Sequence, residues 1–340
     1  MGYTLADIPA EYRPRVVRYL ARLEALRNTP PPGILSFTGL VWQVSVPYGV
    51  HKVEDDFDVG AFRFQEQAGL NGSDSSSMGA IVFQELGLKK VELAWKKADL
   101  GYCFDREMLA TPTDYGRPLS SKPDAYAAET IKARWDLWKK GVYVVLNTNP
   151  FCITSPTKRL WDTGQLANFK DTEQGIFDNI VLNTAYSATA ALDLLSAWTD
   201  MLDARGNRRE DEPNVFFYGK DIEQAVLADF DPTWRTSGTS SDERLRGKYR
   251  LLKLPDLSRA SDYGFMKLDQ APTADMPLSA PIVRLLGNNG ALEVEPINGR
   301  PEDAKFRGKV GALVTERIAT AALDPHSTIR ATPEATIPGV

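Results

Sequence analysis

The chain contains very little cysteine and histidine. Its 340 residues include two cysteines, Cys103 and Cys152, and two histidines, His51 and His326. Two isolated cysteines provide no disulfide framework and indicate reduced thiols in a cytosolic protein. So few histidines argue against a zinc site built on histidine pairs. A nucleophilic cysteine–histidine dyad remains an open alternative, but two buried apolar cysteines are the favoured interpretation.

Long apolar runs and common catalytic motifs are also missing. No segment reaches the ~18 uninterrupted apolar residues of a membrane helix, and the N-terminal MGYTLADIPAEYR lacks the basic-then-apolar order of a secretory signal. Neither Gly219-Lys220-Asp221 nor Gly308-Lys309-Val310 has the spacing and hydroxyl of a phosphate loop, and no dinucleotide fingerprint or serine elbow occurs. We therefore expect no enzyme activity, catalytic residue, cofactor, metal or membrane contact.

The overall charge is weakly acidic, with a formal net charge of −5. This balance argues against a dedicated nucleic-acid binder, which would carry a basic footprint. A weakly acidic wall beside DNA would repel it rather than trap it. The hydrophobic content of 43% and charged content of 25% are those of an ordinary globular protein. The length allows two or three subdomains.

Two charged clusters were weighed as sites. The acidic run at 54–58, beside Gly60, resembles part of a calcium loop but lacks the twelve-residue frame and its bidentate glutamate. A solvated charged ribbon is the better interpretation. Segment 205–212 mixes three arginines with three acidic residues. It is expected to be a solvated turn or, in a self-assembling protein, a charge seam between subunits.

The strongest helix signal is DAYAAETIKARWDLWKKG, from Asp124 to Gly141. Asp124 is suited to cap the first turn, and Gly141 to end the helix in a left-handed conformation. Lysines 139 and 140 favour the C-terminal end of the helix dipole. The predicted apolar stripe consists of Ala128, Ile131, Trp135 and Trp138, with Glu129, Lys132, Arg134 and Lys140 on other faces. We expect this helix to be the spine of the protein.

On its N-terminal side, the sequence predicts an appendage and a long ribbon. A helix within 7–27 is followed by the proline-rich spacer 29–33 and by a strand pattern over 34–46. Residues 51–95 are expected to form a two-stranded arm with a polar tip at Gly69–Gly79, and a strand over 91–104 leads to the spine. A lone ribbon is marginally stable in water, so the arm should rest on something else.

After the spine, the pattern predicts a compact lobe and returning strands. The expected elements are a β-prone run at 143–146, a helix capped by Thr184 or Ser187 and ending at Gly206, a strand at 214–218, a helix at 220–227, strands at 250–255, 263–269, 281–286 and 291–297, and a final strand or strand pair at 311–323. The tail at 324–340 is expected to be loosely held.

This order of elements resembles the major capsid proteins of tailed double-stranded DNA bacteriophages, the Hong Kong ninety-seven fold that encapsulin shells share. Three stretches carry the resemblance: YCFDREMLATPTDYGRPLSSKPDAYAAETIKARWDLWKKG at 102–141, ALDLLSAWTDMLDARGNRREDEPNVFFYGKDIEQAV at 191–226, and VGALVTERIATAALDPHSTIR at 310–330. It rests on element order, since no short motif is diagnostic. The resemblance implies an α+β fold.

The resemblance also implies a domain division and a function. It divides the chain into an N-terminal helix and arm (1–50), an extension hairpin (51–95), a peripheral domain (96–180) with spine helix 125–140, a central axial lobe (181–285), and returning strands with a tail (286–340). It implies pentamers and hexamers of an icosahedral virion shell around DNA, without sequence-specific binding, assembled in the bacterial host cytoplasm. Scaffolding and portal proteins, and possibly decoration proteins, would be its partners.

Three alternatives remain open from the sequence. The first is an encapsulin-like nanocompartment shell, which encloses a cargo enzyme instead of DNA. The second is a soluble α+β enzyme in which Glu92, Asp105 and Glu107 around Tyr102 perform acid–base chemistry. The third is a virion accessory protein such as a decoration or tail protein, for which a spine helix would be unusual.

Overall fold

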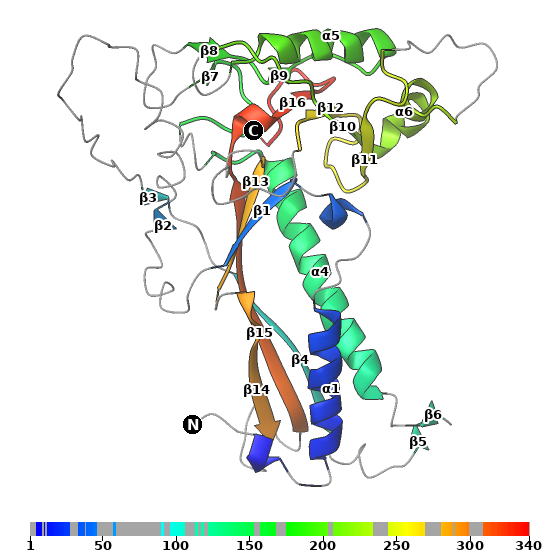
Figure 1. Cartoon of the computed structure of the whole chain (residues 1–340), viewed down its shortest axis with the longest axis vertical. Coiled ribbons are helices and arrows are strands. Elements are labelled where there is room, and N and C mark those ends of the chain that lie inside the picture. Colours follow the sequence, from blue (N-terminus) through cyan, green and yellow to red (C-terminus); the bar gives the residue numbers. More distant parts are fainter. Residues whose placement is uncertain are drawn as a thin grey trace, which may run out of the picture.

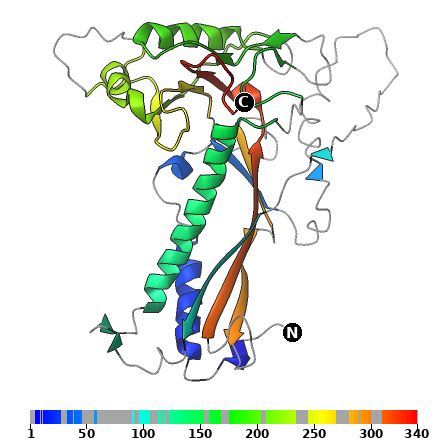
Figure 2. The same cartoon turned by 180° about the vertical axis from the view of Figure 1, so that it is seen from behind.

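A computed structural model describes most of the chain. The described residues are 5–8, 10, 12–27, 33–37, 39–45, 57–58, 90–91, 96–105, 113–114, 117–118, 122–152, 157–167, 175–202, 207–233, 244–268, 280–287, 290–298 and 309–339. They form an elongated body of two helices and a long sheet, with a separate α/β lobe at one end (Figures 1 and 2). The α+β expectation is confirmed.

The spine helix α4 (Lys122–Thr148) is longer than the sequence predicted. It continues through Gly141, and the run at 143–146, predicted as β-prone, is its last buried turn. The helix stops instead at Asn149, which adopts a left-handed φ of 46° before Pro150. Asparagine tolerates this conformation better than most side chains, and proline cannot continue the helix. At 1.5 Å per residue the spine is about 40 Å long.

The closing strand β15 (Lys309–Ala322) is similar in length to the spine helix. At about 3.3 Å per residue it is about 46 Å long, so it can follow the whole spine. Along one edge it pairs with β4 (Lys96–Asp105). Its other edge is shared between β14 (Glu293–Asn298) and β13 (Ile282–Leu286), and β13 pairs in parallel with β1 (Val41–Ser45).

The N-terminal helix α1 (Arg13–Leu26) packs on its own spine. Its buried face carries Val16, Tyr19 and Leu23, and the Tyr19 hydroxyl lies 2.9 Å from the Thr130 hydroxyl. The predicted appendage is therefore part of the body of this chain. The predicted strand over 34–46 begins only at Val41, after the short helix η2 (Ile34–Ser36).

The lobe is built on a second five-stranded sheet. Its strands, in spatial order, are β11 (Arg250–Leu254), β10 (Val215–Gly219), β12 (Tyr263–Met266), β16 (Thr328–Ala331) and β9 (Ile180–Val181). Helix α5 (Ala188–Asp200) packs on this sheet, and α6 (Glu223–Phe230) packs beside it. As predicted, the Ser187 hydroxyl caps α5, accepting a hydrogen bond from the Ala190 N–H, but α5 ends at Asp200 rather than Gly206.

The C-terminal tail is not loosely held, contrary to the prediction. Strand β16 lies inside the lobe sheet, between β12 and β9, and its four residues are buried. The preceding turn, η9 (Pro325–Ser327), is buried as well. Proximity to the chain end was the wrong criterion, because a terminal strand with two neighbours is fixed by ladder hydrogen bonds and burial.

Several short elements complete the chain. They are η1 (Leu5–Asp7), β2 (Phe57–Asp58), β3 (Lys90–Val91), β5 (Thr113–Asp114), β6 (Arg117–Pro118), β7 (Gln165–Leu166), β8 (Ile176–Phe177) and η6 (Lys220–Ile222). Strands β2 and β3 pair antiparallel within the predicted 51–95 arm. The predicted polar tip at 69–79 lies outside the described residues.

The spine and the closing strand approach each other closely at Gly141, where a larger side chain would meet Thr320. A Cβ atom there would lie 2.8 Å from the Thr320 hydroxyl oxygen and 3.3 Å from the Thr320 Cβ. We predict that Gly141→Ala destabilises the protein by about 1 kcal/mol, because overpacking costs about 1–3 kcal/mol and outweighs the roughly 1 kcal/mol gained in helix propensity.

Urea unfolding would measure this effect, and Thr320→Ala supplies the control. In the Thr320→Ala background the same glycine substitution should cost less, because the hydroxyl that it meets is gone. A stabilising Gly141→Ala in the presence of Thr320 would contradict the close approach.

Candidate functional site

A buried ion pair joins the spine helix to the closing strand. Arg134, predicted to lie off the apolar stripe, is 4% exposed, and its Nε donates to Glu316 Oε1 over 2.9 Å. The indole N–H of Trp138 donates to the other Glu316 oxygen, also over 2.9 Å. The predicted stripe is corrected accordingly: Ala128 is exposed, and Ala127 is buried in its place. Glu316 thus holds two spine residues one helical turn apart.

A second guanidinium, that of Arg284 on β13, enters the same cluster. Arg284 is 3% exposed and donates to the Trp138 carbonyl over 3.1 Å. The guanidinium carbons of Arg284 and Arg134 lie 4.3 and 4.5 Å from the Trp138 ring centroid. Burial lowers the pKa of Arg284 to about 10, against the opposing effect of Glu316. One carboxylate and one indole ring therefore stabilise two buried cations.

A second buried ion pair fastens the other end of the spine to the lobe. Arg330 on β16 is fully buried; its Nε donates to Asp262 over 2.8 Å and one Nη donates to the Leu146 carbonyl over 2.8 Å. This places a cation at the C-terminal end of the helix dipole. Burial lowers the pKa of Arg330. Gly339 packs against the Thr148 carbonyl, where a Cβ atom would clash at 2.2 Å.

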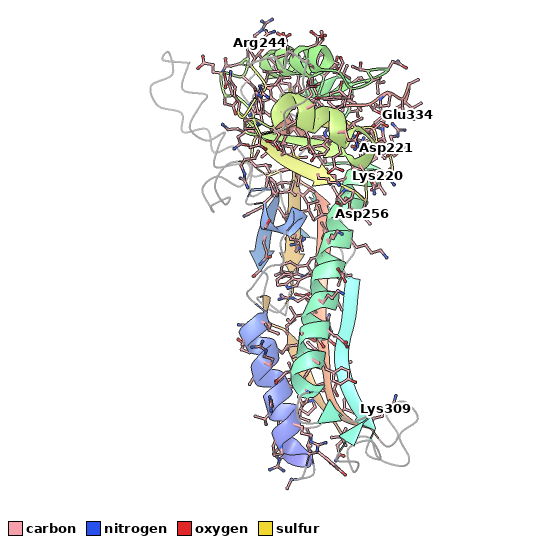
Figure 3. The ribbon with its side chains drawn as sticks, turned by 90° about the vertical axis from the view of Figure 1, so that its right-hand side faces the viewer. Lys220, Asp221, Arg244, Asp256, Lys309 and Glu334 are labelled. Carbon is pink, nitrogen blue, oxygen red and sulfur yellow. The ribbon has the colours of Figure 1, made fainter. Side chains whose placement is uncertain are left out.

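A polar clamp on the surface surrounds this joint. The Asp256 carboxylate lies 3.0 Å from Lys139 Nζ, and the Asp256 carbonyl accepts from the Asn147 amide over 3.0 Å. The Asn147 side-chain oxygen in turn accepts from the Ser258 N–H over 2.9 Å. Figure 3 shows Asp256 beside the upper part of α4, below the lobe. Spine and lobe are thus joined by directional contacts from three sides.

A groove of about 350 Å³ lies between η2, the spine and β11. Its lining includes Ile34, Leu35, Trp135, Asp136, Lys139 and Tyr143. Burial, reinforced by the charge of Asp256, raises the pKa of Tyr143 to about 12. The walls are mainly apolar, and both lysines of the lining are paired, Lys139 with Asp256 and Lys253 with Glu223. The groove therefore has the character of a packing surface rather than of an acid–base site.

Of the candidate catalytic residues, the structure describes the side chains of His326 and Cys152. Both ring nitrogens of His326 have partners, since Asp324 Oδ1 lies 2.7 Å from Nδ1 and the Ala167 carbonyl lies 3.0 Å from Nε2. Cys152 is buried in the core at the joint. Several candidates lie outside the described residues, namely His51, Glu92, Glu107 and the acidic residues at 54–56. The same holds for the side chains of residue 58 and of strand β4, which includes residues 102, 103 and 105.

The described residues contain no group of three or more potential metal ligands. Within the same residues, no helix is long and apolar enough to cross a membrane.

The 205–212 cluster turns partly inward, which corrects the prediction of a wholly solvated turn. Arg209 pairs with Asp211 at 2.6 Å, its guanidinium stacks 4.3 Å from the Trp198 ring centroid, and it donates to the His326 carbonyl. Arg208, Glu210 and Glu212 are exposed, and Arg208 pairs with Asp200 on the surface. Sequence reasoning missed Arg134, Arg284, Glu316 and Arg330. Arg134 did carry a signal, because it falls three and seven residues after Ile131 and Ala127 on the buried side.

Comparison with solved structures finds chains that are similar to this one at low sequence identity. The chain is similar to the capsid of an empty GTA particle (14% identity over 91% of this chain and 94% of that chain, TM-score 0.41). It is also similar to a phage-related protein from Bordetella bronchiseptica RB50 (11% identity over 96% of this chain and 97% of that chain, TM-score 0.44). A further similar structure is the holo-SrpI encapsulin complex from Synechococcus elongatus PCC 7942 (11% identity over 93% of this chain and 95% of that chain, TM-score 0.43). No protein-family model and no curated protein matches. The solved structures are of the kinds that the sequence resemblance named.

The ion cluster predicts a large cost for neutralising its carboxylate. Glu316→Gln should destabilise the protein by about 3–5 kcal/mol, because two buried guanidinium groups would lose their only anionic partner in the cluster. Denaturant unfolding is the measurement. Arg208→Gln, which breaks an exposed pair with side chains 78% and 64% exposed, is the matched control and should change stability by less than about 1 kcal/mol. Equal effects would contradict the role of the cluster.

Tyr143 predicts a loss of stability at alkaline pH. The pKa of Tyr143 in the folded protein is about 12, above the ordinary value of 10.0. The contribution of the neutral phenol to the unfolding free energy is therefore complete below pH 10 and is lost as the pH rises through 12. Tyr143→Phe should therefore flatten the fall in unfolding free energy between these pH values, relative to wild type. Urea unfolding at several pH values tests this, and parallel curves for the two proteins would contradict it.

Proposed function

We propose that this chain is the structural subunit of a protein shell, the major capsid protein of a tailed double-stranded DNA bacteriophage. The observation that supports this most is the pairing of a 27-residue spine helix with a 14-residue closing strand, topped by a separate lobe. A narrow body of this kind gives a subunit long lateral surfaces. An enzyme of this length would instead be expected to concentrate its polar groups around a cleft.

Exposed apolar side chains support lateral contacts along the whole molecule. On the body they include Leu5, Val17 and Val294, and on and near the lobe they include Phe151 and Ile176, which are 54% and 65% exposed. Contacts at both ends suit a head-to-tail arrangement in which different surfaces of identical subunits meet and close into rings. Pentamers and hexamers of this kind would build an icosahedral shell around DNA.

The finer features follow from the same proposal. The subunit would have a structural and not a catalytic role, would assemble in the bacterial host cytoplasm, and would become part of the virion. Scaffolding and portal proteins, and possibly decoration proteins, would be its partners. The five-part division at 50, 95, 180 and 285 would describe its domains, with the 51–95 ribbon lying on a neighbouring subunit.

The proposal predicts that the purified protein forms closed shells or five- and six-membered rings. Negative-stain microscopy and sedimentation over a range of protein concentrations would show them. Shells that enclose a cargo enzyme and no DNA when made in cells would assign the chain to a nanocompartment instead. A protein that remains a monomer at high concentration would overturn the shell proposal.

A further inference from the structure

The outer surface of helix α1 is basic in an otherwise acidic chain. Residues 12–27 contain five arginines, one glutamate and no lysine, while the whole chain has a net charge of −5. Arginines 15, 18 and 22 are three and four residues apart, which places them on one side of the helix, about one turn from each other. We name these three residues the arginine ridge. In Figure 3 α1 lies at the edge of the body, away from the lobe.

Helix stability does not explain this charge pattern. The helix dipole favours acidic residues in the first turn and cations in the last. Helix α1 has no acidic residue in its first turn and no basic residue in its last, where Glu24 lies, and Arg13 and Arg15 are at its beginning. The arginines at the beginning therefore oppose the dipole, whereas Arg27, the C-cap residue, complements it and pairs with Glu24. A pattern with this cost suggests that the arginines serve a contact outside the helix.

Two members of the ridge, Arg18 and Arg22, share one carboxylate, that of Asp124. Arg18 binds Asp124 through Nε at 3.1 Å and through a second nitrogen, with the Arg18 side chain still 54% exposed. The pKa of Asp124 is lowered chiefly by this hydrogen bond and further by the charges of Arg18 and Arg22. Two guanidinium groups thus act on one carboxylate. Arg13 donates to the Ala6 and Ile8 carbonyls, which are neutral acceptors.

We infer that the arginine ridge binds the phosphate backbone of nucleic acid without reading its sequence. Guanidinium groups match phosphate in bidentate geometry, and a straight row of them suits a polymer with regularly spaced anions. This inference rests on the proposed function, in which the subunit encloses DNA. It gives a shell wall of negative net charge one local attractive contact with the polymer, while the remaining surface repels it.

The test measures how tightly the full-length protein binds a short labelled DNA duplex. Fluorescence anisotropy of the duplex reports this affinity between about 50 and 200 mM salt. The double variant Arg18→Gln/Arg22→Gln should reduce the slope of log affinity against log salt by about 1.8, which is the release of two counterions. Arg18→Lys/Arg22→Lys keeps both charges and should keep the slope. Arg208→Gln, an exposed arginine on the lobe, is the matched control and should leave the slope unchanged.

Two results would overturn the inference. The first is an unchanged slope in the glutamine variant, with circular dichroism showing an intact fold. The second is displacement of the duplex by polyglutamate as effectively as by unlabelled DNA at equal charge, which would indicate an acidic protein partner. Microscopy of the same samples reports shell formation separately, so that a monomer with the expected change in slope would overturn the shell proposal alone.

Discussion

The structure depends on one carboxylate, that of Glu316, at the place where the spine helix crosses the closing strand. It accepts hydrogen bonds from Arg134 and Trp138 on the helix, and its charge also stabilises the guanidinium of Arg284 from the neighbouring strand. Apolar contacts alone would allow a helix to slide or rotate on a sheet, because they are not directional. Buried hydrogen bonds to a charged group fix one register, since every alternative leaves a charge without a partner. The cluster therefore defines the geometry of the elongated body.

The same principle is repeated at the joint with the lobe. Arg330 and Asp262 form a fully buried pair, and Arg330 also binds the Leu146 carbonyl of the helix. Between the two clusters, Gly141 lets the helix approach Thr320 of β15 closely. The spine is thus fixed near its middle and at its end by ionic contacts, with a close backbone approach between them. The contacts hold the spine against both the body sheet and the lobe.

Local patterns predicted the elements better than their ends and their partners. The stripe of Ile131, Trp135 and Trp138 identified the spine, and the hydroxyl of Ser187 identified the start of α5, because both signals lie within a few residues of sequence. The prediction placed the helix end at Gly141 because glycine is common at helix ends. In the structure this glycine lies inside the helix, where it packs against Thr320. The helix actually ends before Asn149-Pro150, a dipeptide that is itself a turn signal in the sequence. Burial of the tail had no local signal, since it depends on β12 and β9 on either side.

The candidate site was hidden for a related reason. Arg134 and Glu316 are 182 residues apart, and Arg330 and Asp262 are 68 apart. A single charged residue within a helix is normally solvated, so the sequence favours an exposed Arg134 until its distant partner is known. The body sheet combines β4, β13, β14 and β1 around β15, the last of these strands in the chain. The spine can form locally soon after synthesis, but its buried arginine has no counterion until β15 arrives. Non-local closure of this kind is slow, because the loop entropy is lost before the contacts form. The Glu316 cluster can therefore form only once the closing strand has docked on the spine, because its carboxylate lies on β15.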